Sequence, residues 1–146
     1  MTLDAISSAW KIVAGLKARD IQATAKFYAE ELHFTVSKPY QDSEASEPTF
    51  VSVSAGHKAA ANLYYSKLGS CGGGSEGSFP AGEAYIALGT EELDRFYNAL
   101  VEMGHVRVVE EVEDKPWGYR QFTIADPDGN RLTFFRFLEG GNPGME

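Results

Sequence analysis

The stretch DKPWGYRQFTIADPDGNRLTFF, residues 114–135, decides the fold of this chain. Gln121, Thr123 and Ala125 alternate with Phe122, Ile124 and then Asp126, which is the period-two pattern of a β-strand. Residues 126–130 read Asp-Pro-Asp-Gly-Asn and predict a tight turn. Pro127 presets φ, Gly129 accepts a positive φ, and the acidic side chains can accept hydrogen bonds from nearby backbone amides. Apolar residues return beyond the turn, so the stretch predicts a β-hairpin.

The rest of the chain repeats one plan twice, with an offset of 72 residues. Two amphipathic helices are expected at residues 21–32 and 91–103, because apolar side chains recur there at helical spacing. Asp20 and Thr90 are the expected N-caps, and Gly104 is the expected stop of the second helix. Four strands are expected in the first half: residues 12–17, a short strand around Phe34 and Val36, residues 49–54 and residues 60–66. Four are expected in the second half: residues 84–89, a strand around Val106 and Val108, residues 119–125 and residues 132–137.

This order predicts one domain at residues 11–138, built from two β-α-β-β-β modules at 11–68 and 83–138. The intervening segment, 69–82, begins with a run of Gly and Ser that favours a flexible linker. Residues 139–146 are expected to form a flexible tail.

Composition narrows the range of partners. The chain has 146 residues, is 43% hydrophobic and carries a net charge of −8, so it can bury a core but has no Lys/Arg cluster for nucleic acid. Cys71 is the single cysteine and cannot form an internal disulfide, which favours a reducing compartment. The sequence contains no apolar run of signal-peptide or membrane-spanning length. We therefore expect a cytoplasmic protein that binds neither membrane nor nucleic acid.

The hairpin resembles a known family. Pro116-Trp117-Gly118-x-Arg120, then a strand and Asp-Pro-Asp-Gly-Asn, is similar to the last hairpin of the vicinal oxygen chelate superfamily. This superfamily includes glyoxalase I, extradiol dioxygenases, fosfomycin-resistance enzymes and bleomycin-resistance binding proteins. Residues 17–21, Lys-Ala-Arg-Asp-Ile, look like its first strand and helix. The resemblance implies an α+β fold of two βαβββ modules forming half-open barrel sheets, the glyoxalase/bleomycin resistance/dihydroxybiphenyl dioxygenase fold, and a homodimer.

The resemblance also locates the positions where metal-dependent members place their ligands. Those members hold Zn, Ni, Fe or Mn with His, Gln or Glu on four strands. The matching positions here are Val13, Asn62, Tyr85 and Thr133. Valine offers no lone pair, and the other three are weak ligands for divalent metals. We therefore expect no metal and no other cofactor.

No catalytic constellation appears in the sequence. His33, His57 and His105 fall at a helix end or in turns, without a metal-binding spacing. There is no Gly-x-Ser-x-Gly elbow, and Cys71 has no fixed base beside it. We therefore expect no catalytic residues.

Aromatic and polar side chains remain as candidates for a ligand-binding site. Trp117 resembles the tryptophan beside the ligand groove of bleomycin-resistance-type members. Arg120 has two readings, a charge on the cavity floor or a partner of an acidic strand neighbour. The acidic run has two readings, a solvated strand end or a rim that attracts cations; its members are Glu110, Glu111, Glu113 and Asp114. The candidate ligand-binding residues are Phe50, Asn62, Tyr65, Tyr85, Trp117, Arg120, Thr133 and Phe135.

The sequence therefore favours a metal-independent binding protein that sequesters a small ligand, with a cationic or aromatic molecule as the first candidate. Two alternatives stay open. One is a metal-dependent glyoxalase/lyase- or dioxygenase-like enzyme with an atypical site. The other is an interaction or stress-related dimer with a degenerate cavity.

Overall fold

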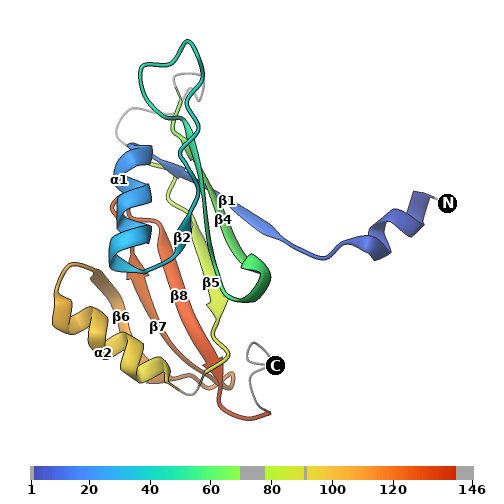
Figure 1. Cartoon of the computed structure of the whole chain (residues 1–146). Helices are drawn as coiled ribbons and strands as arrows, with labels where there is room; N and C mark the ends of the chain where they lie inside the picture. Colours follow the sequence, from blue (N-terminus) through green and yellow to red (C-terminus); the bar gives the residue numbers. More distant parts are fainter. Residues whose placement is uncertain (1, 70–77, 91, 141–146) are drawn as a thin grey trace.

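The computed structural model describes residues 2–69, 78–90 and 92–140. These residues form two mixed four-stranded sheets with helices α1 and α2 on the same side (Figure 1). The fold is the α+β architecture that the sequence predicts. Cys71 and the glycine run of the expected linker lie outside the described residues, as does most of the expected tail.

The first sheet has the strand order β1-β4-β3-β2. β1 pairs in parallel with β4, and the other two pairs are antiparallel. A short α-helix leads into a π-helical turn, Phe27–Glu31, between β1 and β2, and a 3₁₀ turn, His57–Ala59, joins β3 to β4. The bounds are β1 Val13–Ala18, α1 Ile21–Lys26, β2 Thr35–Val36, β3 Phe50–Ala55 and β4 Ala61–Lys67.

The second sheet repeats this arrangement in the order β5-β8-β7-β6. β5 pairs in parallel with β8, while β8, β7 and β6 are antiparallel neighbours. The bounds are β5 Glu83–Ala87, α2 Leu93–Met103, β6 Arg107–Asp114, β7 Tyr119–Ala125 and β8 Arg131–Phe137. The equivalent strand of each module therefore occupies the equivalent place in its sheet.

Local chemistry explains the ends of the helices. The side chain of Asp20 accepts the amide hydrogen bond of Ala23 and caps α1, as predicted. Gly104 adopts a φ of 73° and ends α2, also as predicted. The prediction for Thr90 is wrong by two residues. Its hydroxyl accepts the amide hydrogen bond of Glu92, which itself occupies the cap position.

One core lies between the sheets and the helices. Tyr28 is fully buried against the first sheet, and Phe96 and Tyr97 of α2 pack edge-on against Phe122 of the second sheet. Buried residues from both modules form one continuous apolar cluster. Because side chains alternate along a strand, the opposite face of each sheet is not part of this core.

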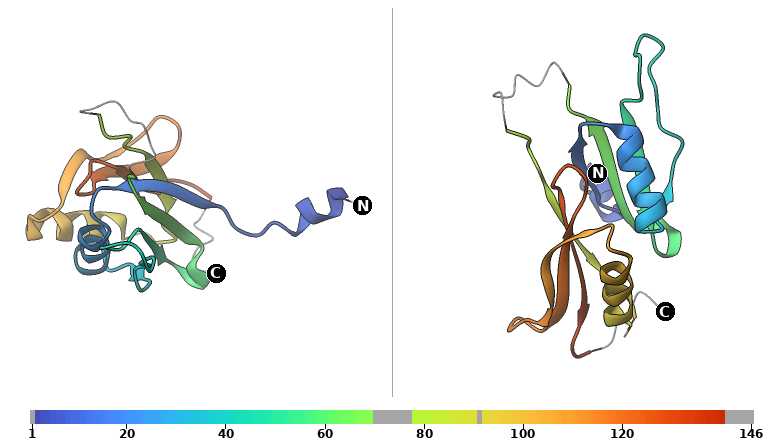
Figure 2. Two further views of the ribbon diagram at one scale, coloured as in Figure 1. Left: turned by 90° about the horizontal axis from the view of Figure 1, so that it is seen from above. Right: turned by 90° about the vertical axis from the view of Figure 1, so that its left-hand side faces the viewer.

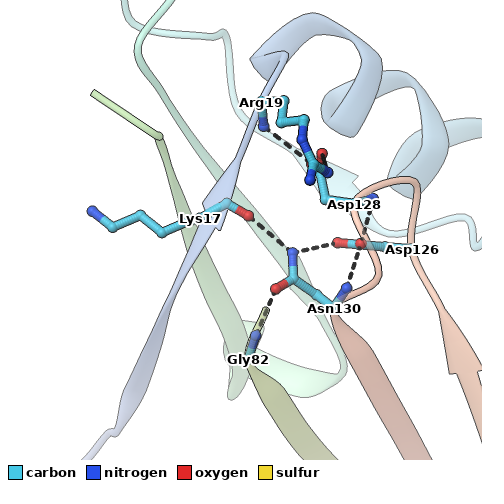
Figure 3. A network of polar contacts seen from close by, with 6 residues as sticks. All are labelled: Lys17, Arg19, Gly82, Asp126, Asp128 and Asn130. Atoms are coloured by element: carbon cyan, nitrogen blue, oxygen red, sulfur yellow. Dashed lines mark hydrogen bonds and ion pairs between the residues drawn. The ribbon is translucent and has the colours of Figure 1, made fainter. Parts of the chain in front are cut away.

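The turn at residues 126–130 attaches the second module to the first (Figure 3). The carboxylate of Asp126 accepts the backbone amides of Asp128 and Asn130 at 2.9 Å each. The side-chain nitrogen of Asn130 donates to the carbonyl of Lys17 at the end of β1, and its oxygen accepts the amide of Gly82. This turn is thus closed on itself and bound to β1 and to the approach to β5.

Two tyrosines continue the network into the core. The hydroxyls of Tyr28 and Tyr65 share a hydrogen bond, and the Tyr28 hydroxyl lies 3.4 Å from the Asp126 carboxylate. Burial raises the pKa of both tyrosines and of Asp126, although the hydrogen bonds that Asp126 accepts oppose the shift of its own pKa. The junction between the modules therefore holds polar groups away from water.

An N-terminal arm, residues 2–12, extends from the start of β1 and points away from the two sheets (Figures 1 and 2). It consists of a 3₁₀ helix, Thr2–Ser8, and a segment without regular secondary structure, residues 9–12. Within the described part of the chain, no helix is long and apolar enough to cross a membrane.

Candidate ligand-binding site

The face of the second sheet opposite α2 carries a group of aromatic side chains. Tyr119 and Phe135 stack with their ring centroids 4.5 Å apart and an interplanar angle of 15°. Phe137 packs against Phe135 at 5.9 Å, and Tyr85 lies 6.5 Å from it on the other side. Tyr85 is 59% exposed. These rings offer a surface on which a planar molecule can stack.

A hollow of about 140 Å³ lies on the same face, with an uncharged polar floor. The hydroxyls of Thr123 and Thr133 are hydrogen-bonded at 2.7 Å. Gln121 accepts a hydrogen bond from the indole of Trp117 at 3.3 Å. These hydroxyl and amide groups can exchange their present partners for polar atoms of a ligand.

Charged side chains surround this hollow. Glu83, Glu110, Lys115 and Arg131 contribute to its lining. The ammonium of Lys115 pairs with Glu113 and lies 4.0 Å from Glu110, and the Glu113 hydrogen bond raises the pKa of Lys115. The site therefore places aromatic rings next to both acidic and basic groups.

The open face of the first sheet carries one aromatic pair. Phe50 and Tyr64 contact each other edge-on, with centroids 5.1 Å apart. The side chain of Asn62 donates to the Ser52 hydroxyl and to the Val53 carbonyl, so its amide nitrogen is already satisfied by the sheet.

The structure brings together four of the eight sequence-predicted site residues. Tyr85, Trp117 and Thr133 line the 140 Å³ hollow, and Phe135 lies beside Tyr85. Asn62 and Tyr85 both line a second hollow of about 430 Å³ between the modules. Phe50 lies on the open face of the other sheet.

The two remaining residues lie on the helix-covered face of their sheets. Tyr65 was expected in the site, but it is fully buried against Tyr28, because its side chain points toward the π-helical turn that follows α1. Arg120 pairs with its acidic strand neighbour Asp114, which is the second of its two readings, and also with a helix residue that the sequence did not indicate. Its guanidinium binds Asp94 of α2 through two 2.7 Å hydrogen bonds and also binds Asp114. The hydrogen bonds that Asp94 accepts from Arg120 lower the pKa of Asp94.

Sequence reasoning missed Tyr119, Gln121 and Thr123 as site residues. Their signal was present in the alternation of β7, which places all three on the face opposite Phe122. The register of β7 with β8 sets Gln121 opposite Phe135 and Thr123 opposite Thr133. Because Thr133 and Phe135 of β8 lie on the open face, their partners in the hairpin, Thr123 and Gln121 of β7, lie on it as well.

The four positions aligned with metal ligands fall into two cross-strand pairs. Val13 is in register with Asn62, and Tyr85 is in register with Thr133. The equivalent pairing in both modules supports the alignment, but the side chains do not suit a divalent metal. Among residues 2–69, 78–90 and 92–140, no three His, Cys, Asp or Glu side chains gather in a group that could hold a metal ion.

Two βαβββ modules with open sheet faces define the fold class of glyoxalases, bleomycin resistance proteins and dioxygenases. The chain belongs to the Glyoxalase/Bleomycin resistance protein/Dioxygenase superfamily, whose family model matches residues 12–134.

The similarity to an individual relative covers less of the chain than the family model does. The chain is similar to a bleomycin resistance protein of Geobacillus stearothermophilus, with 31% identity over 62 residues, which are 42% of this chain and 47% of that protein. The match therefore spans about half the length of this relative.

Solved structures share the fold over most of the chain. A superfamily member from Sphaerobacter thermophilus is 26% identical with a TM-score of 0.66, covering 89% of this chain and 98% of that one. TnmS3, an antibiotic binding protein from Streptomyces sp. CB03234, is 20% identical with a TM-score of 0.65, covering 88% and 96%.

Proposed function

We propose that this protein binds a small aromatic ligand on the open face of the second sheet, without a metal, and sequesters it without chemical change. The observation that carries the proposal is the stacked aromatic surface beside an uncharged polar floor. Stacking favours a planar ligand, and the hydroxyl and amide groups can orient it. The similarity to bleomycin resistance proteins and to an antibiotic binding protein supports the same kind of function.

A cationic aromatic molecule is the proposed ligand class. Glu110 and Glu113 of β6 are in register with Thr123 and Gln121, so carboxylates border the floor of the hollow. The chain as a whole carries a net charge of −8, which attracts cations. An aromatic cation would gain both from these charges and from the exposed ring of Tyr85. At Trp117 it would have to displace the Lys115 ammonium, which lies 5.7 Å from the centre of the ring.

The site is proposed to be completed by a second copy of the chain in a cytoplasmic homodimer. The hollow measures about 140 Å³, whereas pockets that enclose a small organic molecule usually measure roughly 300–1,000 Å³. A second subunit placed over the open face would supply the missing wall.

Fluorescence titration tests the binding proposal. In a Trp10→Phe variant, Trp117 is the only tryptophan, and its emission can be followed with metal-free bleomycin, ethidium and neutral 2-naphthol. We expect saturable quenching, strongest for the two cations. Tyr85→Ala should weaken binding at least tenfold. Tyr40→Ala, which removes an equally exposed tyrosine from the first module, should leave it unchanged. Absence of saturable binding by all three probes would refute the proposal.

Elemental analysis of protein purified without chelator tests metal independence. We expect no stoichiometric Zn, Ni, Fe or Mn. About one metal per chain, lost on substitution of Asn62 or Tyr85, would contradict the proposal and favour a lyase- or dioxygenase-like enzyme.

A further inference from the structure

The ammonium of Lys115 already occupies the acidic side of the candidate site. It pairs with Glu113, lies 4.0 Å from Glu110 and lies 5.7 Å from the centre of the Trp117 ring. A cation this close to an indole ring is attracted by it. The Lys115 side chain is 16% exposed, whereas those of Glu110 and Glu113 are 50% and 61% exposed. Lys115 therefore lies in the hollow that it lines and does not extend into solvent.

The turn between β6 and β7 positions this lysine. The Lys115 amide donates to the Tyr119 carbonyl at 2.7 Å, and the Lys115 carbonyl accepts the Gly118 amide at 3.0 Å. Gly118 has a φ of 93°, a conformation that glycine adopts without strain. The closed turn therefore holds the backbone of Lys115 and of Trp117 close together, beside the hollow.

The groups around the ammonium of Lys115 are those that bind an organic cation. Glu110 and Glu113 lie on the open face, because they are directly opposite residues of β7 that line the hollow. Two carboxylates can accept hydrogen bonds from an ammonium or a guanidinium, and the face of an indole attracts the same charge. A cationic ligand and Lys115 therefore compete for the same groups.

We propose that Lys115 determines the specificity of this site, because in the free protein its ammonium takes the place of the ligand's cationic group. This inference rests on the proposed function and adds to it the position of the ligand's charge. A neutral aromatic molecule can stack on the open face while Lys115 stays in place. An aromatic cation displaces Lys115, and its own charge then meets the carboxylates. A simple cation without a ring displaces Lys115 and gains no stacking, so Lys115 disfavours it.

The strand register indicates how far the ligand's charge lies from its ring. Glu113 of β6 is opposite Gln121 of β7, which is opposite Phe135 of β8. Neighbouring strands are about 4.8 Å apart, so the acidic strand lies roughly 10 Å from the strand that carries Phe135. The ligand class is therefore a planar aromatic group joined to an amine or a guanidine by a linker that spans this distance.

Isothermal titration calorimetry with two matched probes tests this inference. Naphthylbutylammonium and naphthylbutanol share the ring and the tail but differ in charge. Lys115→Met removes the competing charge and should tighten binding of naphthylbutylammonium at least tenfold, while the affinity for naphthylbutanol changes less than about threefold. Lys115→Arg keeps the charge and should leave both affinities within about threefold of those of the unsubstituted protein.

Two further variants separate a local effect from a general one. Lys26→Met changes the net charge by the same amount but lies on α1 of the other module, so both affinities should stay unchanged. Combining Lys115→Met with Glu113→Gln should remove most of the gain, because the probe then meets one carboxylate fewer. Circular dichroism checks that each variant is folded.

The outcomes distinguish this inference from the proposed function. If both probes bind the unsubstituted protein and Lys115→Met binds naphthylbutylammonium no more tightly, the specificity role of Lys115 is overturned and the ligand-binding proposal stands. An equal gain for both probes would also overturn that role, since it would show that Lys115 only fills space. If neither probe binds either protein, this inference fails, and the fluorescence titration decides the proposed function separately.

Discussion

Replacing Asn130 by alanine should be among the most destabilising single substitutions in this chain. Asn130 is fully buried, and its side chain bonds to the Lys17 carbonyl, the Gly82 amide and the Asp126 carboxylate at 2.8–2.9 Å. The substitution leaves a backbone carbonyl and a backbone amide without their partner, at about 1–3 kcal/mol each. The free energy of unfolding should therefore fall by about 3–4 kcal/mol, out of the roughly 5–15 kcal/mol typical of a domain.

Urea unfolding followed by far-UV circular dichroism measures this loss directly. The matched control is Gln41→Ala, which removes another side-chain amide that bonds to a backbone carbonyl but lies at the surface. Its free energy of unfolding should change by less than about 0.5 kcal/mol. A loss below about 1 kcal/mol for Asn130→Ala would show that the turn does not hold the two modules together.

Three further predictions concern charge and exposure. Carbon-detected NMR titration should give Asp126 a pKa above the ordinary value of about 3.9, because burial raises it. The native state then binds this proton more tightly than the unfolded state does. The contribution of Asp126 to the free energy of unfolding should therefore fall as the pH rises from the ordinary pKa through the raised one. A pKa at or below the ordinary value would contradict this prediction. Arg120→Gln should cost about 1 kcal/mol, since its partner Asp94 is half-exposed, and should raise the pKa of Asp94; an unmoved Asp94 pKa would contradict the ion pair. Trp117→Ala should lower the free energy of unfolding by less than about 1 kcal/mol, because its ring is 59% exposed, yet weaken bleomycin binding at least tenfold. Large destabilisation with unchanged affinity would remove Trp117 from the site.

The fold could be predicted from the sequence because its signals are local. The alternation in β7, the Asp-Pro-Asp-Gly-Asn turn and the caps at Asp20 and Gly104 each depend on a few neighbouring residues. Together with the repeated order of elements, they indicate both modules. Most strand ends shift by one or two residues, but β6 continues to Asp114, six residues beyond the expected strand around Val106 and Val108. The acidic run in this part of the chain gave no apolar pattern by which the longer strand could be predicted.

The site was only partly predictable because it depends on which face of each strand the helices cover. Adjacent Tyr64 and Tyr65 must point to opposite faces, but the sequence does not say which one meets Tyr28. The partner of Arg120 lies 26 residues earlier, on α2, and no local pattern indicates that bond. Tyr85 and Thr133 were found because the family resemblance specified their positions.

The network at the module junction also bears on how the chain is made. The Tyr28 hydroxyl faces a carboxylate 98 residues further along the chain, and the Lys17 carbonyl is bound by a side chain 113 residues away. As synthesis runs from the N-terminus, the first module emerges while these partners do not yet exist. All strands of the first module are then present, but the Tyr28 hydroxyl and the Lys17 carbonyl gain their hydrogen-bond partners only when the last hairpin has been made. The half of the protein made first therefore completes its polar contacts only after the half made last has been synthesised.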